Sequence, residues 1–172
     1  MYDFEKLDKQ DMINILVKCW MTHDGMWFYN SFNELGIEKA NKLNKAAISS
    51  LAPFEIGRFK KLLKIDQVRT YDDIKFFFSE VARMLIPDFM NFVWEFSEDK
   101  TISWGFSEDK TCFAYNGMCM IGIAEQYECG PIHRIKSWLD TIGVEYRITP
   151  DVGKCMMPKE GKCKGTIVFH NM

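Results

Sequence analysis

Residues 92–111 read FVWEFSEDKTISWGFSEDKT, and this stretch decides the fold class. Its apolar residues run together or alternate as they do in β-strands, whereas the chain before it has helical spacing. The hexapeptide Phe-Ser-Glu-Asp-Lys-Thr occurs at 96–101 and again at 106–111. Each Ser-Glu-Asp-Lys is typical of a polar turn between strands. We therefore predict a three-strand antiparallel meander that ends near Tyr115.

Upstream of this stretch, the spacing of apolar residues predicts helices throughout residues 1–90. One amphipathic helix covers about 8–22, and a longer one covers 71–90. Between them, a helix over about 38–50 is interrupted by Pro53, and a short helix comes after it, because proline cannot supply the backbone N–H that a helix interior needs.

Downstream, we predict a helical hairpin over about 118–142, broken near Gly130-Pro131 and stopped at Gly143. Two further strands come next, at 144–149 and 165–170. The fold class is thus α+β, with an N-terminal helical half (1–90) packed on an antiparallel sheet and helical-hairpin half (91–172). No linker is visible in the 172 residues, so we expect a single domain over 1–172.

The charge balance argues against nucleic-acid and membrane-surface roles. The formal net charge is -2, from 22 basic and 24 acidic side chains, which gives no global field to attract phosphate backbones or anionic lipid. The N-terminus lacks the basic start and apolar run of a signal peptide, and no later run is long enough to span a bilayer. We therefore expect a cytoplasmic protein.

Cysteines are the most distinctive residues of the C-terminal half. Five of the six lie between Cys112 and Cys163, and in the cytosol they would stay reduced. Three soft thiolates and one imidazole make a tetrahedral set for zinc or iron, which predicts Cys129, His133, Cys155 and Cys163 as metal ligands. The alternative is that these cysteines are packed as small hydrophobic residues and that His133 lies on the surface.

Two places could supply catalytic groups. His23 and Asp24 stand beside Trp27, and an imidazole near a carboxylate can act as a general base or metal ligand in an aromatic pocket. Alternatively, Gly25 breaks the helix there and Asp24 caps the segment after the break. Cys129 precedes a predicted helix start, where a thiolate nucleophile would be stabilised.

Two segments resemble the L-2-amino-thiazoline-4-carboxylic acid hydrolase family. The first is Cys19-Trp20-Met21-Thr22-His23-Asp24-Gly25-Met26-Trp27-Phe28, together with a similar run at 36–44. The second is the C-terminal block with Tyr127, Cys129, Gly130, Trp138, Gly143 and Cys163, which is also loosely similar to 4-vinyl reductase-like ligand-binding domains. The resemblance implies water-driven opening of a cyclic thiazoline at the carbon between nitrogen and sulfur. Only one cysteine stands at 155–159, where many members of that group have two.

These observations lead to three hypotheses. The first is a small-molecule site lined by His23, Trp27, Phe28, Tyr127 and the C-terminal cysteines, which would hydrolyse a cyclic amide or amidine such as a 2-aminothiazoline carboxylate. There His23 or a bound metal would activate water, with Asp24 nearby and Cys129 or His133 assisting the leaving group. The second is a non-catalytic sensor or carrier, and the third is a metal-stabilised structural domain. The expected partner is a small-molecule ligand or substrate; a homodimer is compatible with the sequence.

Overall fold

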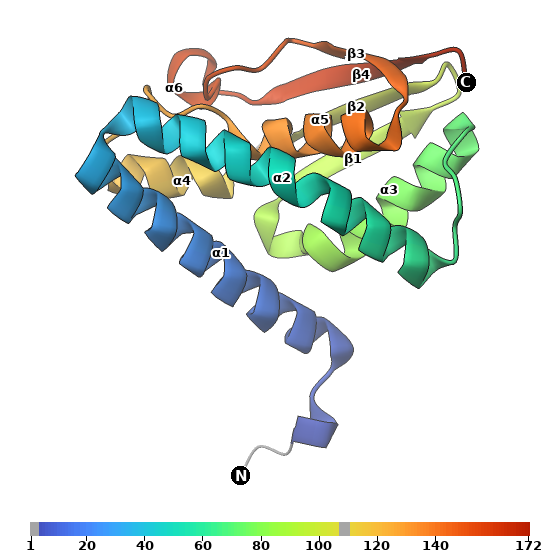
Figure 1. Cartoon of the computed structure of the whole chain (residues 1–172), viewed down its shortest axis with the longest axis horizontal. Coiled ribbons are helices and arrows are strands. Elements are labelled where there is room, and N and C mark those ends of the chain that lie inside the picture. Colours follow the sequence, from blue (N-terminus) through green and yellow to red (C-terminus); the bar gives the residue numbers. More distant parts are fainter. Residues whose placement is uncertain (1–3, 107–110) are drawn as a thin grey trace.

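The computed structural model describes residues 4–106 and 111–172, and it has the predicted α+β class (Figure 1). Three helices precede the first strand: α1 (Lys9–Leu35), α2 (Ile37–Leu63) and α3 (Tyr71–Leu85). After it come α4 (Phe113–Met120), α5 (Gly130–Ile142) and the one-turn α6 (Met157–Glu160). The strands are β1 (Phe92–Ser97), β2 (Thr101–Phe106), β3 (Glu145–Thr149) and β4 (Lys164–His170), and short 3-10 turns lie at Phe4–Lys6 and Asp88–Met90.

The four strands form one antiparallel sheet in the order β1-β2-β4-β3. Along β1, half-buried Phe92, Trp94 and Phe96 alternate with exposed residues, so one face of the sheet carries the aromatic side chains. Gly165 of β4 lies opposite Trp104 of β2, and a Cβ at Gly165 would come within 2.5 Å of the Trp104 ring. A glycine is therefore needed at this crossing.

The main core lies between this inner face and the helices. Its largest fully buried side chains are Phe77 and Phe78 of α3 and Trp138 of α5, together with Ile102 and Ile167 of the sheet. The Phe78 ring contacts Trp94 on the sheet and Trp138 on α5 at centroid distances of 5.3 and 6.3 Å. Both predicted halves of the chain thus contribute to one core.

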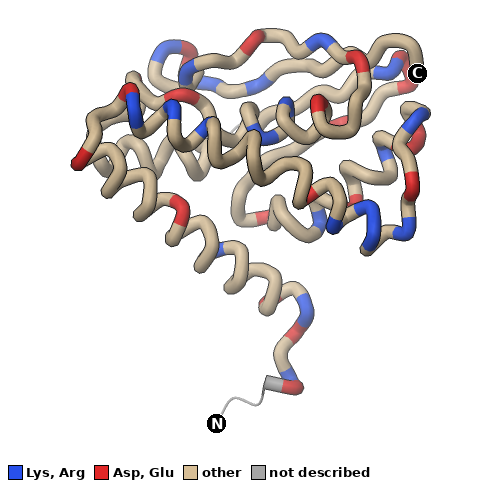
Figure 2. Tube along the Cα trace, viewed as in Figure 1, with Lys and Arg blue, Asp and Glu red and all other residues tan. Residues whose placement is uncertain are grey.

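The N-terminal part of α1 projects away from the other elements, and a single residue, Gly36, links α1 to α2 (Figure 1). Gly36 has φ 78°, a left-handed value that favours glycine. Only Val17 and Phe28 of α1 are buried, whereas Ile15, Leu16, Met26 and Trp27 are more than half exposed. Charged residues of both signs are spread over the other elements, and few lie on α1 (Figure 2).

Several predicted boundaries are confirmed. The β1–β2 hairpin turns at the first Phe-Ser-Glu-Asp-Lys-Thr copy, and the strands after α5 begin and end within a residue of the predicted positions. Gly143 ends α5 in the left-handed conformation, with φ 82°. Among the described residues, no helix has the length and apolar character required to cross a membrane.

The predicted third strand is wrong where the structure describes it. Residues 107–110 of that prediction lie outside the described residues, but Phe113 begins α4. Its Phe113, Ala114, Gly117 and Met118 line one cavity wall at helical spacing. β4, not a third meander strand, takes the place beside β2.

Two predicted helix breaks are also wrong. α1 continues from Thr22 through Gly25 to Leu35; a helix-interior glycine costs about 1 kcal/mol relative to alanine, and burial of Phe28 offsets this. α2 continues through Pro53, whose ring is exposed, while its neighbours Ala52 and Ile56 are buried in the core. In both places tertiary packing outweighs the local helix-breaking preference.

Candidate functional site

An apolar cavity of about 260 Å³ lies between α1, α4 and α5. Part of α2, the end of α3, the following 3-10 turn and the nearest ends of β1 and β2 complete its wall. Most of its lining is aromatic or aliphatic, including Trp20, Phe28, Ile48, Phe92, Phe106, Phe113, Met118, Ile135 and Trp138. Concave apolar sites with a few convergent polar groups are typical of small-molecule pockets.

Four polar side chains reach this lining: Asp24 of α1, Asn44 of α2, Tyr127 of the α4–α5 loop and Arg134 of α5. Within the described residues, the Asp24 carboxylate, the Asn44 amide and the Arg134 Nη1 atom make no hydrogen bond. The wall therefore offers both acceptors and donors to anything inside the cavity.

Arg134 is held in place from two sides. Its Nε donates to a Glu55 carboxylate oxygen at 3.1 Å, and its Nη2 donates to the other oxygen. The guanidinium carbon lies 4.3 Å from the Trp20 ring centroid and 5.2 Å from that of Trp138. Glu55 is buried and also accepts from the Trp138 indole N–H at 2.7 Å. The bidentate ion pair with Glu55 and the two tryptophan rings fix the orientation of the guanidinium, and so the direction of the remaining N–H groups of Arg134.

Asp24 stands at the rim on α1, facing this guanidinium. Asp24 keeps contact with solvent, and partial burial of its carboxyl group against the apolar wall raises its pKa, while the charges of Arg134 and His23 partly oppose the rise. A carboxyl group with a raised pKa can exchange a proton closer to neutral pH than an ordinary aspartate.

Tyr127 forms the inner end of the cavity. Its hydroxyl accepts from the Gly130 N–H at 3.1 Å, and its ring meets Phe28 edge-to-face at a centroid distance of 5.5 Å. A Cβ at Gly130 would come within 2.7 Å of that hydroxyl oxygen. Burial, above all, raises the pKa of Tyr127, so the hydroxyl keeps its proton and can donate it into the cavity.

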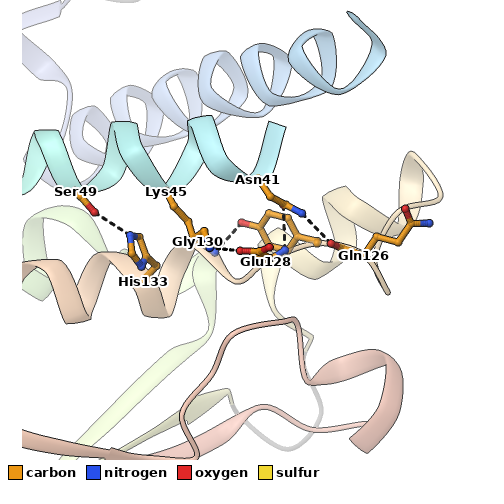
Figure 3. A network of polar contacts seen from close by, with 8 residues as sticks. Asn41, Lys45, Ser49, Gln126, Glu128, Gly130 and His133 are labelled. Atoms are coloured by element: carbon orange, nitrogen blue, oxygen red, sulfur yellow. Dashed lines mark hydrogen bonds and ion pairs between the residues drawn. The ribbon is translucent and has the colours of Figure 1, made fainter. Parts of the chain in front are cut away.

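Asn41 of α2 positions the loop that carries Tyr127 (Figure 3). Its buried amide donates to the Gln126 carbonyl at 2.9 Å and accepts from the Glu128 N–H at 3.1 Å. Glu128 also forms an ion pair with Lys45. These contacts fasten both backbone neighbours of Tyr127 to α2.

A second, more open hollow of about 320 Å³ lies on the other side of the α2–α5 contact. His133 lines it, and the Nε2 atom of His133 lies 2.9 Å from the Ser49 hydroxyl (Figure 3). Lys136 pairs with Asp151 at 2.7 Å across the same hollow. Burial lowers the pKa of His133, opposed by a hydrogen bond to the Lys45 carbonyl. The His133 ring, carried by α5, is thus hydrogen-bonded to α2.

The structure separates the predicted site residues. Asp24, Phe28 and Tyr127 line the cavity, whereas Trp27 is 65% exposed and His23 also lies on the exposed side of α1. Cys129 and His133 line the second hollow instead. Burial raises the pKa of the Cys129 thiol, and a protonated thiol is a poor nucleophile.

The predicted Cys129, His133, Cys155 and Cys163 metal set is not assembled. Across residues 4–106 and 111–172, no three His, Cys, Asp or Glu side chains already form a group that could hold a metal ion. The His133 ring contacts Ser49, whereas Cys129, Cys155 and Cys163 pack in the main core. Zinc or iron binding by these residues remains a prediction.

The sequence alone does not point to Trp20 and Arg134 as cavity residues, or to Glu55 as the partner that holds Arg134. Trp20 stands in the sequence only as part of the segment that carries the family resemblance, and no pattern singles out Arg134. The available signal is a glutamate in an otherwise apolar stretch of α2, Ala52-Pro53-Phe54-Glu55-Ile56, because a buried carboxylate needs a partner.

One comparison bears on this arrangement. The model of a family of unknown function (DUF6125) matches residues 3–81. The matched part spans α1, α2 and most of α3, which supply Trp20, Asp24 and Glu55; Tyr127 and Arg134 lie beyond it. No curated protein and no solved structure matches the chain.

Proposed function

We propose that this protein binds a small, flat, largely apolar molecule in the cavity, with the polar end of that molecule between Asp24 and Arg134. The observation that carries the proposal is an apolar cavity at whose wall three polar groups, the Asp24 carboxylate, the Asn44 amide and the Arg134 Nη1 atom, have no hydrogen-bond partner among the described residues. Polar groups in an ordinary protein core are nearly always hydrogen-bonded within the protein, so unpaired polar groups at an apolar wall favour a ligand.

The volume sets the size of the ligand. An apolar cavity of about 150 Å³ is enough for benzene, and this cavity holds about 260 Å³. One substituted ring or two fused small rings fit that space. Aromatic walls favour a flat molecule, because ring faces and edges pack against it at little entropic cost.

The charges set its polarity. Glu55 already neutralises Arg134, so the guanidinium offers hydrogen bonds more than net positive charge. Asp24 and the Asn44 carbonyl can accept, while Arg134, Asn44 and Tyr127 can donate. A ligand with a donor and an acceptor at one end suits this wall.

Hydrolysis of a cyclic amide or amidine, such as a 2-aminothiazoline carboxylate, is the second candidate function. It is favoured by the Asp24 carboxyl group at the cavity wall, whose raised pKa suits proton transfer. Asp24 would take a proton from the attacking water and return it to the departing nitrogen or sulfur. Arg134 would orient the carboxylate of the substrate.

Binding is tested by filling the cavity without disturbing the fold. Gly25 lines the cavity, and a Cβ there meets nothing within 4 Å, so Gly25→Leu places a side chain into the space. Gly57 on α2 is exposed, does not line the cavity and is equally unobstructed, which makes Gly57→Leu the matched control. Both replace a helical glycine by a good helix former, so neither should lower stability.

Indole is the probe, and methionine methyl NMR is the readout. Indole should shift Met21, Met90 and Met118, which line the cavity, and leave the 88% exposed Met120 unchanged. Gly25→Leu should abolish the shifts and Gly57→Leu should keep them. Equal shifts in both variants would refute the cavity as the site.

The hydrolytic role is tested by turnover of a thiazoline carboxylate, which Asp24→Asn should abolish. Turnover that Asp24→Asn leaves intact would refute the hydrolytic role of Asp24.

A further inference from the structure

α1 carries a second apolar stripe on the side opposite its buried residues. Neighbouring residues of a helix point about 100° apart, so residues that recur at spacings of three and four share one face. Cys19 therefore points away from the side on which Val17 and Phe28 are buried. The stripe centred on Cys19, which we call the outer stripe, consists of Met12, Ile15, Leu16, Cys19, His23 and Met26. Trp27 lies beside it, about 80° further round the helix.

The outer stripe is exposed and has no charged carboxylate or lysine. More than half of each of three of its side chains is exposed, namely Ile15, Leu16 and Met26. It contains no Lys, Arg, Asp or Glu, and few charges lie on α1 (Figure 2). The nearest charges point elsewhere, because Lys18 lies 5.0 Å from the Phe89 ring centroid and Asp24 lines the cavity. A helix with apolar residues on opposite sides is ordinarily buried on both.

The outer stripe is complementary to itself. Cys19 stands seven residues from both Met12 and Met26, and four residues from both Ile15 and His23. Two antiparallel copies of α1 with a two-fold axis at Cys19 would therefore place Met12 of each copy against Met26 of the other. Spacings of three and four are those at which the side chains of two helices interlock.

We propose that the outer stripes of two copies of this chain pair in antiparallel orientation and form a two-fold dimer. The N-terminal part of α1 projects away from the other elements (Figure 1). An antiparallel pair therefore leaves the two sheets and their helices at opposite ends of the contact, whereas a parallel pair would crowd them at the same end. The stripe offers no charge that would select an oppositely charged partner, and a C2 contact requires only a self-complementary surface.

The exposed area sets the strength of the dimer. Ile15, Leu16 and Met26 each expose about 100 Å² of apolar surface. With the other members of the stripe, the pair would bury roughly 1,000 Å² in total, near the lower limit of about 1,200 Å² for standard specific interfaces. Interfaces of this size are weak and transient. The dimer should therefore form in concentrated protein, and dilute protein should be the monomer described above.

Sedimentation velocity of the reduced full-length chain, over a concentration series up to the millimolar range, tests the dimer. The wild type should shift from monomer to dimer. Leu16→Glu places a carboxylate in each stripe, keeps a good helix former and should stay monomeric throughout. Leu62→Glu on α2 and Met120→Glu at the end of α4 also charge exposed apolar positions, but off the stripe, and should dimerise like the wild type.

Cross-linking with a short bismaleimide tests the orientation. Cys19→Ser and Cys119→Ser together remove the two exposed thiols, and this doubly substituted chain is the blank. Met12→Cys and Met26→Cys are then introduced into separate chains. An antiparallel pair predicts a covalent dimer when the two chains are mixed and none from either chain alone.

The proposal is overturned by a wild type that stays monomeric, by a dimer that Leu16→Glu leaves intact, or by cross-linking of Met12→Cys or Met26→Cys with itself. Loss of the dimer in Leu62→Glu or Met120→Glu would also overturn it, by placing the contact elsewhere. Indole binding is measured separately on dilute protein, so failure of the dimer leaves the proposed function standing.

Discussion

At the scale of single residues, Asp24 and Asp73 show how the same side chain takes opposite electrostatic roles. Partial burial of Asp24 at the cavity wall raises the pKa of its carboxyl group. Asp73 accepts from the backbone N–H groups of Arg69 and Thr70, both at 2.9 Å, and these bonds lower the pKa of Asp73. Together with the Thr70 side chain it forms the capping box of α3.

The two residues should therefore give opposite pH dependences. Because the folded state holds the Asp24 proton more tightly than the unfolded chain, ionisation of Asp24 costs stability as pH rises above the ordinary value of 3.8. Asp24→Asn should match the wild type at lower pH and become the more stable protein through that window. Urea unfolding at a series of pH values measures the difference.

Asp73→Asn is the control with the reverse sign. The ionised Asp73 stabilises the folded state above pH 3.8, and that contribution is lost as pH falls through its lowered pKa. The variant should be the less stable protein at neutral pH, and the gap should close in acid. A gap of the same sign for both variants would contradict this electrostatic account.

At the scale of elements, α1 presents two apolar faces, and adjacent aromatic residues belong to different ones. Phe28 is 6% exposed against Tyr127, whereas Trp27 is 65% exposed. Phe28→Ala should lower the free energy of unfolding by about 3 kcal/mol through lost burial and a new cavity. Trp27→Ala should change it by less than about 0.5 kcal/mol. Denaturant unfolding compares the two, and equal losses would contradict this division of α1.

α1 also shows which features of the fold the sequence predicts and which it does not. Helical spacing identifies α1, α3 and α5, and the alternation of Phe92, Trp94 and Phe96 identifies the first strand. Helical spacing cannot distinguish Trp27 from Phe28, because α1 carries apolar residues on more than one side. Only the position of Tyr127, about a hundred residues away, decides which aromatic residue is buried.

The candidate site is harder to predict for the same reason. Of the predicted site residues, Asp24, Phe28 and Tyr127 line the cavity, whereas their roles in catalysis and ligand binding stay predictions. The sequence does not indicate Arg134, since the role of Arg134 depends on Glu55, which lies 79 positions earlier. Such long-range ion pairs leave no spacing pattern in a single sequence.

At the scale of the whole molecule, stability should be uneven. α1 buries only Val17 and Phe28, whereas α5 buries six of its 13 residues. Local opening is easiest where few apolar contacts are lost, so amides in the first half of α1 should exchange with solvent much faster than those of α5. Hydrogen exchange by mass spectrometry measures both helices in one experiment. Protection of α1 that rises with protein concentration would show that a second copy covers its exposed face.

Because a single residue, Gly36, links α1 to α2, a small backbone rotation there would move the far end of α1 by a large distance. With 27 residues and a rise of 1.5 Å per residue, α1 is about 40 Å long. A rotation of about 10° at Gly36 would therefore displace the far end at Lys9 by about 7 Å, and Asp24, nearer the pivot, by about half as much. A small rotation of α1 about Gly36 thus gives a much larger displacement at Lys9. A pair of fluorophores, one near Lys9 and one on the sheet, would report such a movement of the cavity wall as a change in energy-transfer efficiency.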